Sequence, residues 1–206
     1  MIPWFRPAVA TLLVAGLAAC GASPPMRYHG LSAAAPGPSS PGSAALLVEV
    51  LPVIVPERVN RDEIVLTAAD GQLDVRDDDR WAGPLTDEIR QLINDALWQR
   101  LRAADSYAAP VALAPDGVAQ YRLALRIERF DAIPNGQAVV EASWTLRRLP
   151  QGRPAICRAG TTESLAGVVP QAAVAALSVA AKRVAAMVAA SLDRLHQGSV
   201  DLCSGS

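Results

Sequence analysis

The sequence predicts a single α+β domain, in which two helices pack on one face of a largely antiparallel sheet. Three observations predict this fold class. Several short segments alternate apolar and polar residues at the two-residue period of a strand, two longer segments carry apolar stripes at the helical period, and short turns join consecutive strands. The chain has 206 residues, of which 51% are hydrophobic, so it can build one domain with its own core.

The first strands of the predicted sheet are short, and proline interrupts one of them. Residues 46–55 are apolar and β-branched, but Pro52 has no N–H to donate. This segment is therefore either an edge strand or a strand that breaks at Pro52. Asp70-Gly71 is a hairpin signal that joins a strand near 64–66 to a return strand near 72–76.

The remaining elements are predicted as a helix, three strands and a second helix. A helix over 84–104 has proline in its first turn and acidic residues near its start, which suits a helix N-terminus. Alternating strands near 121–130, 140–146 and 155–165 follow, separated by turns. An alanine-rich helix over 170–197 has charges in its middle, so we expect it to pack on the sheet and not to span a membrane.

Residues 1–19 have the pattern of a secretory signal peptide. Arg6 gives a positive start, and the uncharged run Ala8–Ala19 has the length of a signal-peptide core. The run ends in Leu-Ala-Ala before Cys20, which resembles the bacterial lipobox. This resemblance implies cleavage before Cys20, with N-acyl and diacylglycerol lipid attached to it, and Gly21 after it favours sorting to the outer membrane. The alternative is an ordinary signal peptide followed by a chance cysteine.

Residues 20–45 form the predicted connection between the lipid and the folded domain, which we expect to cover 46–206. Alanine, proline, serine and glycine dominate this connection, so it cannot bury a core. We expect an extended tether with an r.m.s. span of about 25–30 Å. One patch at 28–31 interrupts it and could form a first edge strand.

Two further cysteines, Cys157 and Cys203, are candidates for a disulfide. The envelope beyond the cytoplasmic membrane permits disulfides, and two remaining cysteines favour one bridge over two free thiols. A bridge closing this span would stabilise the fold by roughly 4 kcal/mol in the chain-entropy account.

Composition and motifs argue against several function classes. Nineteen basic and 20 acidic residues give a net charge of -1, so we expect no nucleic-acid partner. Neither of the two histidines lies in a metalloprotease or hydrolase motif, and we predict no catalytic residue, no metal site and no enzyme activity. The carboxylates of residues 70–79 lack the spacing of a calcium loop and indicate a charged hairpin end.

Two central segments, Val50–Val65 and Gln72–Leu101, resemble the PqiC-type lipoproteins, which are auxiliary components of MCE-family lipid transport systems. The resemblance rests on an ordered set of residues: Tyr28, Pro52, Pro56, Glu57, Arg61, Arg80-Trp81-Ala82 and Pro84-Leu85. It implies a lipoprotein on the periplasmic face of the outer membrane that docks a PqiB-like periplasmic MCE protein of an ABC-type system and supports envelope integrity. Assembly with further copies of the chain is left open.

Arg80 and Trp81 are the candidate partner-binding residues, because arginine and tryptophan dominate interface hot spots. The alternative for Trp81 is packing against the start of the first helix, which the sequence favours and which leaves Arg80 as the exposed member. Two other functions remain open. One is a stand-alone envelope scaffold that binds an outer-membrane protein or peptidoglycan. The other is a small periplasmic enzyme or a lipid carrier, and a carrier needs an apolar cavity between sheet and helices.

Overall fold

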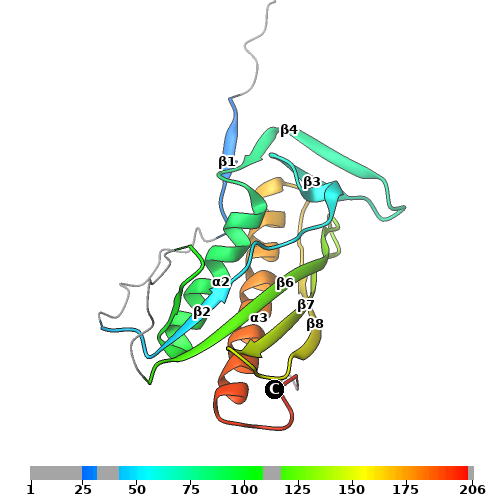
Figure 1. Cartoon of the computed structure of the whole chain (residues 1–206). Helices are drawn as coiled ribbons and strands as arrows, with labels where there is room; N and C mark the ends of the chain where they lie inside the picture. Colours follow the sequence, from blue (N-terminus) through cyan, green and yellow to red (C-terminus); the bar gives the residue numbers. More distant parts are fainter. Residues whose placement is uncertain (1–24, 32–41, 109–116, 204–206) are drawn as a thin grey trace, which may run out of the picture.

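The computed structural model describes residues 25–31, 42–108 and 117–203 (Figure 1). They form one α+β domain, which confirms the predicted fold class. The elements are, in chain order, β1 (Arg27–His29), β2 (Leu46–Val50), the 3-10 helix η1 (Glu57–Val59), β3 (Glu63–Thr67), β4 (Leu73–Trp81), α2 (Leu85–Leu101), β5 (Ala103–Asp105), β6 (Ala119–Ala132), β7 (Gln137–Arg148), β8 (Ala155–Ser164) and α3 (Pro170–His196).

The strands form two mixed sheets where the sequence led us to expect one largely antiparallel sheet. The larger has the order β5-β2-β6-β7-β8 and the smaller the order β1-β4-β3. The β6-β7-β8 meander and the β3-β4 hairpin are antiparallel, as expected from their turns. By contrast, β2 runs parallel to β5 and β6, and β1 runs parallel to β4. The connection from β2 to β5 contains α2, as a parallel crossover requires.

The β2 strand breaks before Pro52 and is not an edge strand. It ends at Val50 and lies between β5 and β6. The chain then rejoins β6 briefly: the Ile54 N–H donates to the Leu125 carbonyl at 3.2 Å, and the Ile127 N–H donates to the Ile54 carbonyl at 2.8 Å. This interruption directs the chain out of the large sheet and into the β3-β4 hairpin.

The two helices lie on the same face of the large sheet, as predicted (Figure 1). Helix α2 ends earlier than expected, because Arg102 takes a left-handed conformation with φ 51° and Ala103 already starts β5. Helix α3 is long and apolar enough to cross a membrane, but one side of it is buried against the sheet and α2. It is therefore a core helix in this fold.

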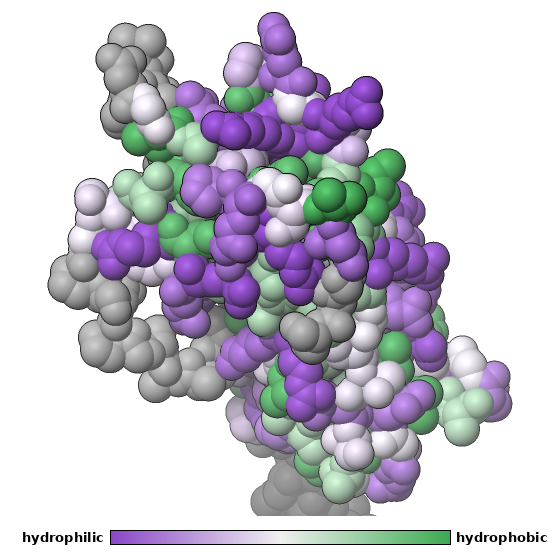
Figure 2. All heavy atoms as spheres, turned by 90° about the horizontal axis from the view of Figure 1, so that it is seen from below, coloured by the Kyte–Doolittle hydropathy of each residue, from purple (hydrophilic) through white to green (hydrophobic). Residues whose placement is uncertain are grey.

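The folded part of the chain begins before the predicted boundary at residue 46. Strand β1 and the fully buried Leu31 lie within the segment assigned to the tether, so this part of it is folded. The predicted signal peptide 1–19 and Cys20 lie outside the described residues. Strand β1 lies at one end of the molecule and the segment after α3 at the other (Figure 1). Seen from that second end, hydrophilic and hydrophobic residues are intermixed on the surface (Figure 2).

Candidate functional site

The N-terminal strand β1 is held to the domain by a buried carboxylate, Asp79. Along β4, Asp79 and Trp81 point inward while Arg80 between them is partly exposed, as the two-residue period requires. In the parallel register Arg27 pairs with Asp79 and His29 with Trp81. The Arg27 guanidinium donates from Nε to Oδ1 at 2.9 Å and from Nη2 to Oδ2 at 2.6 Å, and His29 Nε2 lies 2.7 Å from Oδ1. We call these three residues the Asp79 clamp.

The electrostatics of the clamp favour an ionised Asp79. Its side chain is 1% exposed, and burial alone would raise its pKa. The hydrogen bonds and positive charge of Arg27, with those of His29, outweigh this effect, so the pKa of Asp79 lies below its ordinary value of 3.8. The carboxylate therefore stays negatively charged where two residues of β1 can bind it.

The end of β1 is fastened to the first turn of α2 as well. The Ala82 N–H donates to the His29 carbonyl at 2.8 Å. The Leu31 N–H donates to Glu88 Oε2 at 2.9 Å, and the Leu31 side chain is fully buried. The chain from β1 to Leu31 is thus an integral part of the domain, with polar contacts to both β4 and α2.

The two candidate partner-binding residues point in opposite directions. Trp81 is only 6% exposed and packs edge-to-face on Phe130, with ring centroids 6.1 Å apart. Its side chain is therefore unavailable as a surface anchor. It packs in the core, which is the alternative that the sequence favoured for Trp81. Arg80 has a side chain that is 35% exposed, 3.7 Å from Glu63 Oε1. It shares the exposed face of the small sheet with its register partner Tyr28, whose exposed fraction is 66%.

The large sheet presents a charged face on the side away from the helices. Arg122 on β6 donates to Glu49 on β2 at 2.6 Å, and Arg158 on β8 donates to Glu141 on β7 at 3.2 Å. Glu128 accepts from Ser143 Oγ at 2.6 Å, and this bond lowers the pKa of Glu128. Exposed pairs of this kind contribute little stability each. Their opposite charges are interspersed, so this face carries both signs.

Cys157 and Cys203 are joined by a disulfide, the pairing that the sequence favoured. Their Cα atoms are 5.3 Å apart, and the bridge ties the segment after α3 to β8. The end of α3 is also attached to the sheet, because His196 Nδ1 lies 2.8 Å from the Tyr121 hydroxyl. The bridge and this contact together fix the end of the molecule that lies opposite β1.

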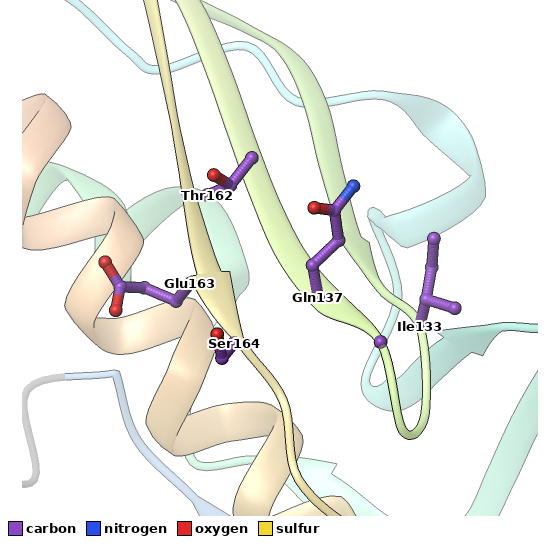
Figure 3. Close-up of a pocket in the computed structure, with 6 residues that line it drawn as sticks. Ile133, Gln137, Thr162, Glu163 and Ser164 are labelled. Carbon is purple, nitrogen blue, oxygen red and sulfur yellow. The ribbon is translucent and has the colours of Figure 1, made fainter.

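A cavity of about 450 Å³ lies where the β6-β7 hairpin meets the end of β8 (Figure 3). Glu163 points toward α3, where it pairs with Arg183, while Thr162 and Gln137 point away from the helix. The residues lining the cavity are mostly polar, which does not fit the apolar chamber that a lipid carrier needs. Within the described ranges, no group of three or more His, Cys, Asp or Glu side chains could hold a metal ion.

Comparison with known proteins decides the family. A family model described as the ABC-type transport auxiliary lipoprotein component matches residues 29–189, more than three quarters of the chain.

The chain belongs to this family.

Membership confirms the resemblance inferred from the central segments. The ABC-type transport auxiliary lipoprotein family is a transport component family and not an enzyme family, and as a lipoprotein family it belongs to the cell envelope. Two solved structures share the fold. One, described as an uncharacterized protein, has a TM-score of 0.63 at 19% identity and covers 81% of this chain and 97% of its own. The other, protein XCC0632 from Xanthomonas campestris (DUF330), has a TM-score of 0.59 at 18% identity and covers 85% and 95%. A search of curated proteins finds no match.

Sequence reasoning missed the Asp79 clamp. Asp79 ends a run of three aspartates, which suggests a solvated turn. The signal that could have found it is the alternation in β4, which puts Asp79 on the same side as Trp81, together with two potential hydrogen-bond donors two residues apart at Arg27 and His29.

Proposed function

We propose that this chain is the outer-membrane-anchored lipoprotein subunit of an MCE/ABC-type lipid transport system. In this role the lipid on Cys20 holds it on the periplasmic face of the outer membrane. Its folded domain docks the periplasmic MCE component, a PqiB-like protein, and so supports envelope integrity. In this role the chain binds and positions a partner protein. It uses no cofactor beyond the covalent N-acyl and diacylglycerol lipid.

The observation that carries the proposal is the place of the family domain in the sequence. The match to the transport auxiliary lipoprotein family begins at His29, and Cys20 of the lipobox lies just nine positions earlier. A lipid-bearing residue directly before a transport auxiliary domain is the arrangement that an anchored docking subunit needs. A second anchoring element is unnecessary, because several acyl chains hold a protein far more firmly than one.

Arg80 is the candidate contact for the partner protein. It lies on the exposed face of the small sheet, and its distance of 3.7 Å from Glu63 leaves a loose ion pair. A loosely paired, partly exposed guanidinium can make bidentate bonds with a carboxylate of a partner. Trp81 supports this role only indirectly, by packing the adjacent strand end into the core.

Co-purification of the lipidated protein with the MCE protein encoded beside it tests the proposal. Labelling with radioactive palmitate should mark the native chain and not the Cys20→Ala variant. The native chain should retain the MCE protein, and Arg80→Glu should weaken this retention by tenfold or more. Arg158→Glu is the matched control, because its side chain is 68% exposed on β8 and its loss should leave the association unchanged.

Failure to recover the MCE protein with a palmitate-labelled chain would contradict the docking role. Recovery of an outer-membrane protein or of peptidoglycan fragments in its place would favour a stand-alone scaffold.

A further inference from the structure

We propose that the β1 end of the domain lies against the lipid bilayer, with Met26 and Tyr28 contacting the headgroup region. This inference rests on the proposed function, because it requires the lipid on Cys20. It adds an orientation to that function and identifies a lipid-contacting surface. We call Met26, Tyr28 and the adjoining exposed face of β1 the membrane-proximal edge.

The length of chain between the lipid and the fold is short. Cys20 would carry the lipid and β1 begins at Arg27, so only residues 21–26 separate them. Seven Cα steps at no more than about 3.6 Å span at most about 25 Å, even when fully extended. A flexible segment of that length has an r.m.s. span of only about 15 Å. The start of β1 must therefore remain close to the bilayer.

The domain is larger than this reach. A fold of about 170 residues has a radius of gyration of about 15 Å and hence a diameter of about 40 Å. Because β1 lies at one end of the molecule and the segment after α3 at the other, the second end cannot turn to meet the membrane (Figure 1). That end carries intermixed hydrophilic and hydrophobic residues, as suits a surface in water (Figure 2).

The Asp79 clamp is what keeps the reach short. If β1 were free, the whole segment from Cys20 to the start of β2 at Leu46 would act as tether. With Arg27 and His29 bound to Asp79, and Leu31 buried, the tether ends at β1. The same clamp turns Tyr28 outward, because neighbouring side chains in a strand point to opposite faces.

The side chains at the membrane-proximal edge have the chemistry of the membrane interface. Met26 is 40% exposed and Tyr28 is 66% exposed, although both are large and apolar in most of their surface. Tyrosine is enriched at membrane–water interfaces, where its ring meets the acyl boundary and its hydroxyl stays hydrated. A bilayer that covers Met26 and Tyr28 would explain why these two side chains are exposed close to the lipid-bearing residue.

The contact depends on apolar surface and not on charge. The basic residues around this edge have acidic partners: Arg27 pairs with Asp79, Arg76 pairs with Asp74, and Arg80 lies 3.7 Å from Glu63. Strand β4 also carries the exposed acidic residue Asp77. Acidic side chains do not attract an anionic lipid surface. Binding of the membrane-proximal edge should therefore be insensitive to salt, unlike that of a polybasic segment.

This orientation also places the candidate partner contact. Arg80 is the register partner of Tyr28 and shares its face of the small sheet. It then lies beside the bilayer and not at the far end of the domain. A protein that docks on Arg80 must itself reach the membrane surface.

Spin labelling of the lipidated protein in vesicles tests the orientation. A nitroxide is attached to Tyr28→Cys in the full lipidated chain, reconstituted in phosphatidylethanolamine–phosphatidylglycerol vesicles. Collision rates with oxygen and with a water-soluble nickel complex are then measured. The matched control is a nitroxide on Gln151→Cys, which is exposed in the turn between β7 and β8, next to the disulfide end of the molecule. Both positions are exposed, so the labels should leave the fold intact.

The expected result is a several-fold loss of nickel collisions at position 28 upon reconstitution, a gain in oxygen collisions there, and no change at position 151. The protection should persist in 0.5 M NaCl, about three times physiological ionic strength. Equal nickel access at both positions in a chain shown by mass spectrometry to carry the lipid would overturn the orientation alone. An N-terminus without lipid would overturn the proposed function and the orientation together.

Discussion

At the scale of single residues, Asp79 has the greatest structural consequence. It is the only member of the run Asp77–Asp79 that is buried, and its two oxygens bind residues some 50 positions earlier in the chain. A buried carboxylate is stable only when its charge is compensated by partners. The ionised Asp79 side chain is therefore one of the contacts that hold β1 in the fold, beside the buried Leu31 and its bond to Glu88.

Asp79 should make stability depend on pH. Because its pKa in the folded protein is lowered below the ordinary 3.8, its contribution is complete above that value and is lost as pH falls through the lower, folded pKa. Asp79→Asn should be about 1–3 kcal/mol less stable than the wild type at pH 7. This difference should shrink below pH 3.8, as urea unfolding from pH 7 to 2 would measure.

The pKa values of Glu63 and Glu128 are also lowered, by the hydrogen bonds from Arg61 and Ser143. These two residues are unchanged in Asp79→Asn, so they contribute equally to the pH dependence of the variant and the wild type. The difference between the wild type and Asp79→Asn therefore isolates the clamp. A difference that stays constant down to pH 2 would contradict an ionised Asp79.

At the scale of elements, the turn between β7 and β8 depends on Gly152. A Cβ at this position would lie 2.6 Å from the Arg148 carbonyl oxygen, and this contact is with backbone that cannot rotate away. Gly152→Ala should therefore destabilise the domain by about 1–3 kcal/mol in urea unfolding. At Gly83, the nearest atom to a Cβ is the far end of Glu88, 3.8 Å away, so Gly83→Ala should stay within about 0.5 kcal/mol. Equal losses in the two variants would show that the turn is not constrained as described.

The disulfide is the second constraint at this scale. Reduction should lower the free energy of unfolding by up to about 4 kcal/mol, since the bridge closes a sequence separation of 46 residues. The double variant Cys157→Ala/Cys203→Ser should match the reduced wild type, and reductant should not change it further. A double variant as stable as the oxidised protein would mean that the remaining contacts of the segment after α3 suffice.

The elements that could be predicted from sequence are those whose neighbours are close in the chain. Tyr121, Leu123 and Leu125 alternate with polar residues, and short turns set the register of β6, β7 and β8. The parallel pairings of β1 and β2 could not be predicted, because no turn joins them to β4 or β6. Helix α2 was placed correctly but extended too far, since nothing in the sequence marks Arg102 as left-handed.

The candidate site divides in the same way. Two remaining cysteines in a compartment that permits disulfides were enough to favour the Cys157–Cys203 bridge. The position of Trp81 beside a helix start was enough to favour its burial. The Asp79 clamp was missed because a run of aspartates predicts a solvent-exposed turn. In the structure, β1 covers Asp79 and buries it. The alternation in β4 places Asp79 on the inward face, but it does not show which distant segment of the chain covers that face.

At the scale of the whole molecule, anchoring and folding should be separable. Replacing residues 1–20 with a cleavable signal peptide that lacks the cysteine should release the protein into the soluble periplasmic fraction. Its thermal unfolding should match that of the lipidated chain, because the described fold starts only with the residues just before β1. Cell fractionation and circular dichroism measure both outcomes, and retention at the membrane would show a second anchor.

The parallel pairing of β1 with β4 has a mechanical consequence. A pull between a bilayer-bound anchor and a partner held by the domain acts along β1 from its first residue. Such a load acts on the β1–β4 pairing and on the Arg27–Asp79 pair together. The resistance of this attachment is governed by an unfolding rate and not by equilibrium stability. In the proposed role, in which the lipid holds one end and the docked MCE protein pulls on the domain, the load has this direction.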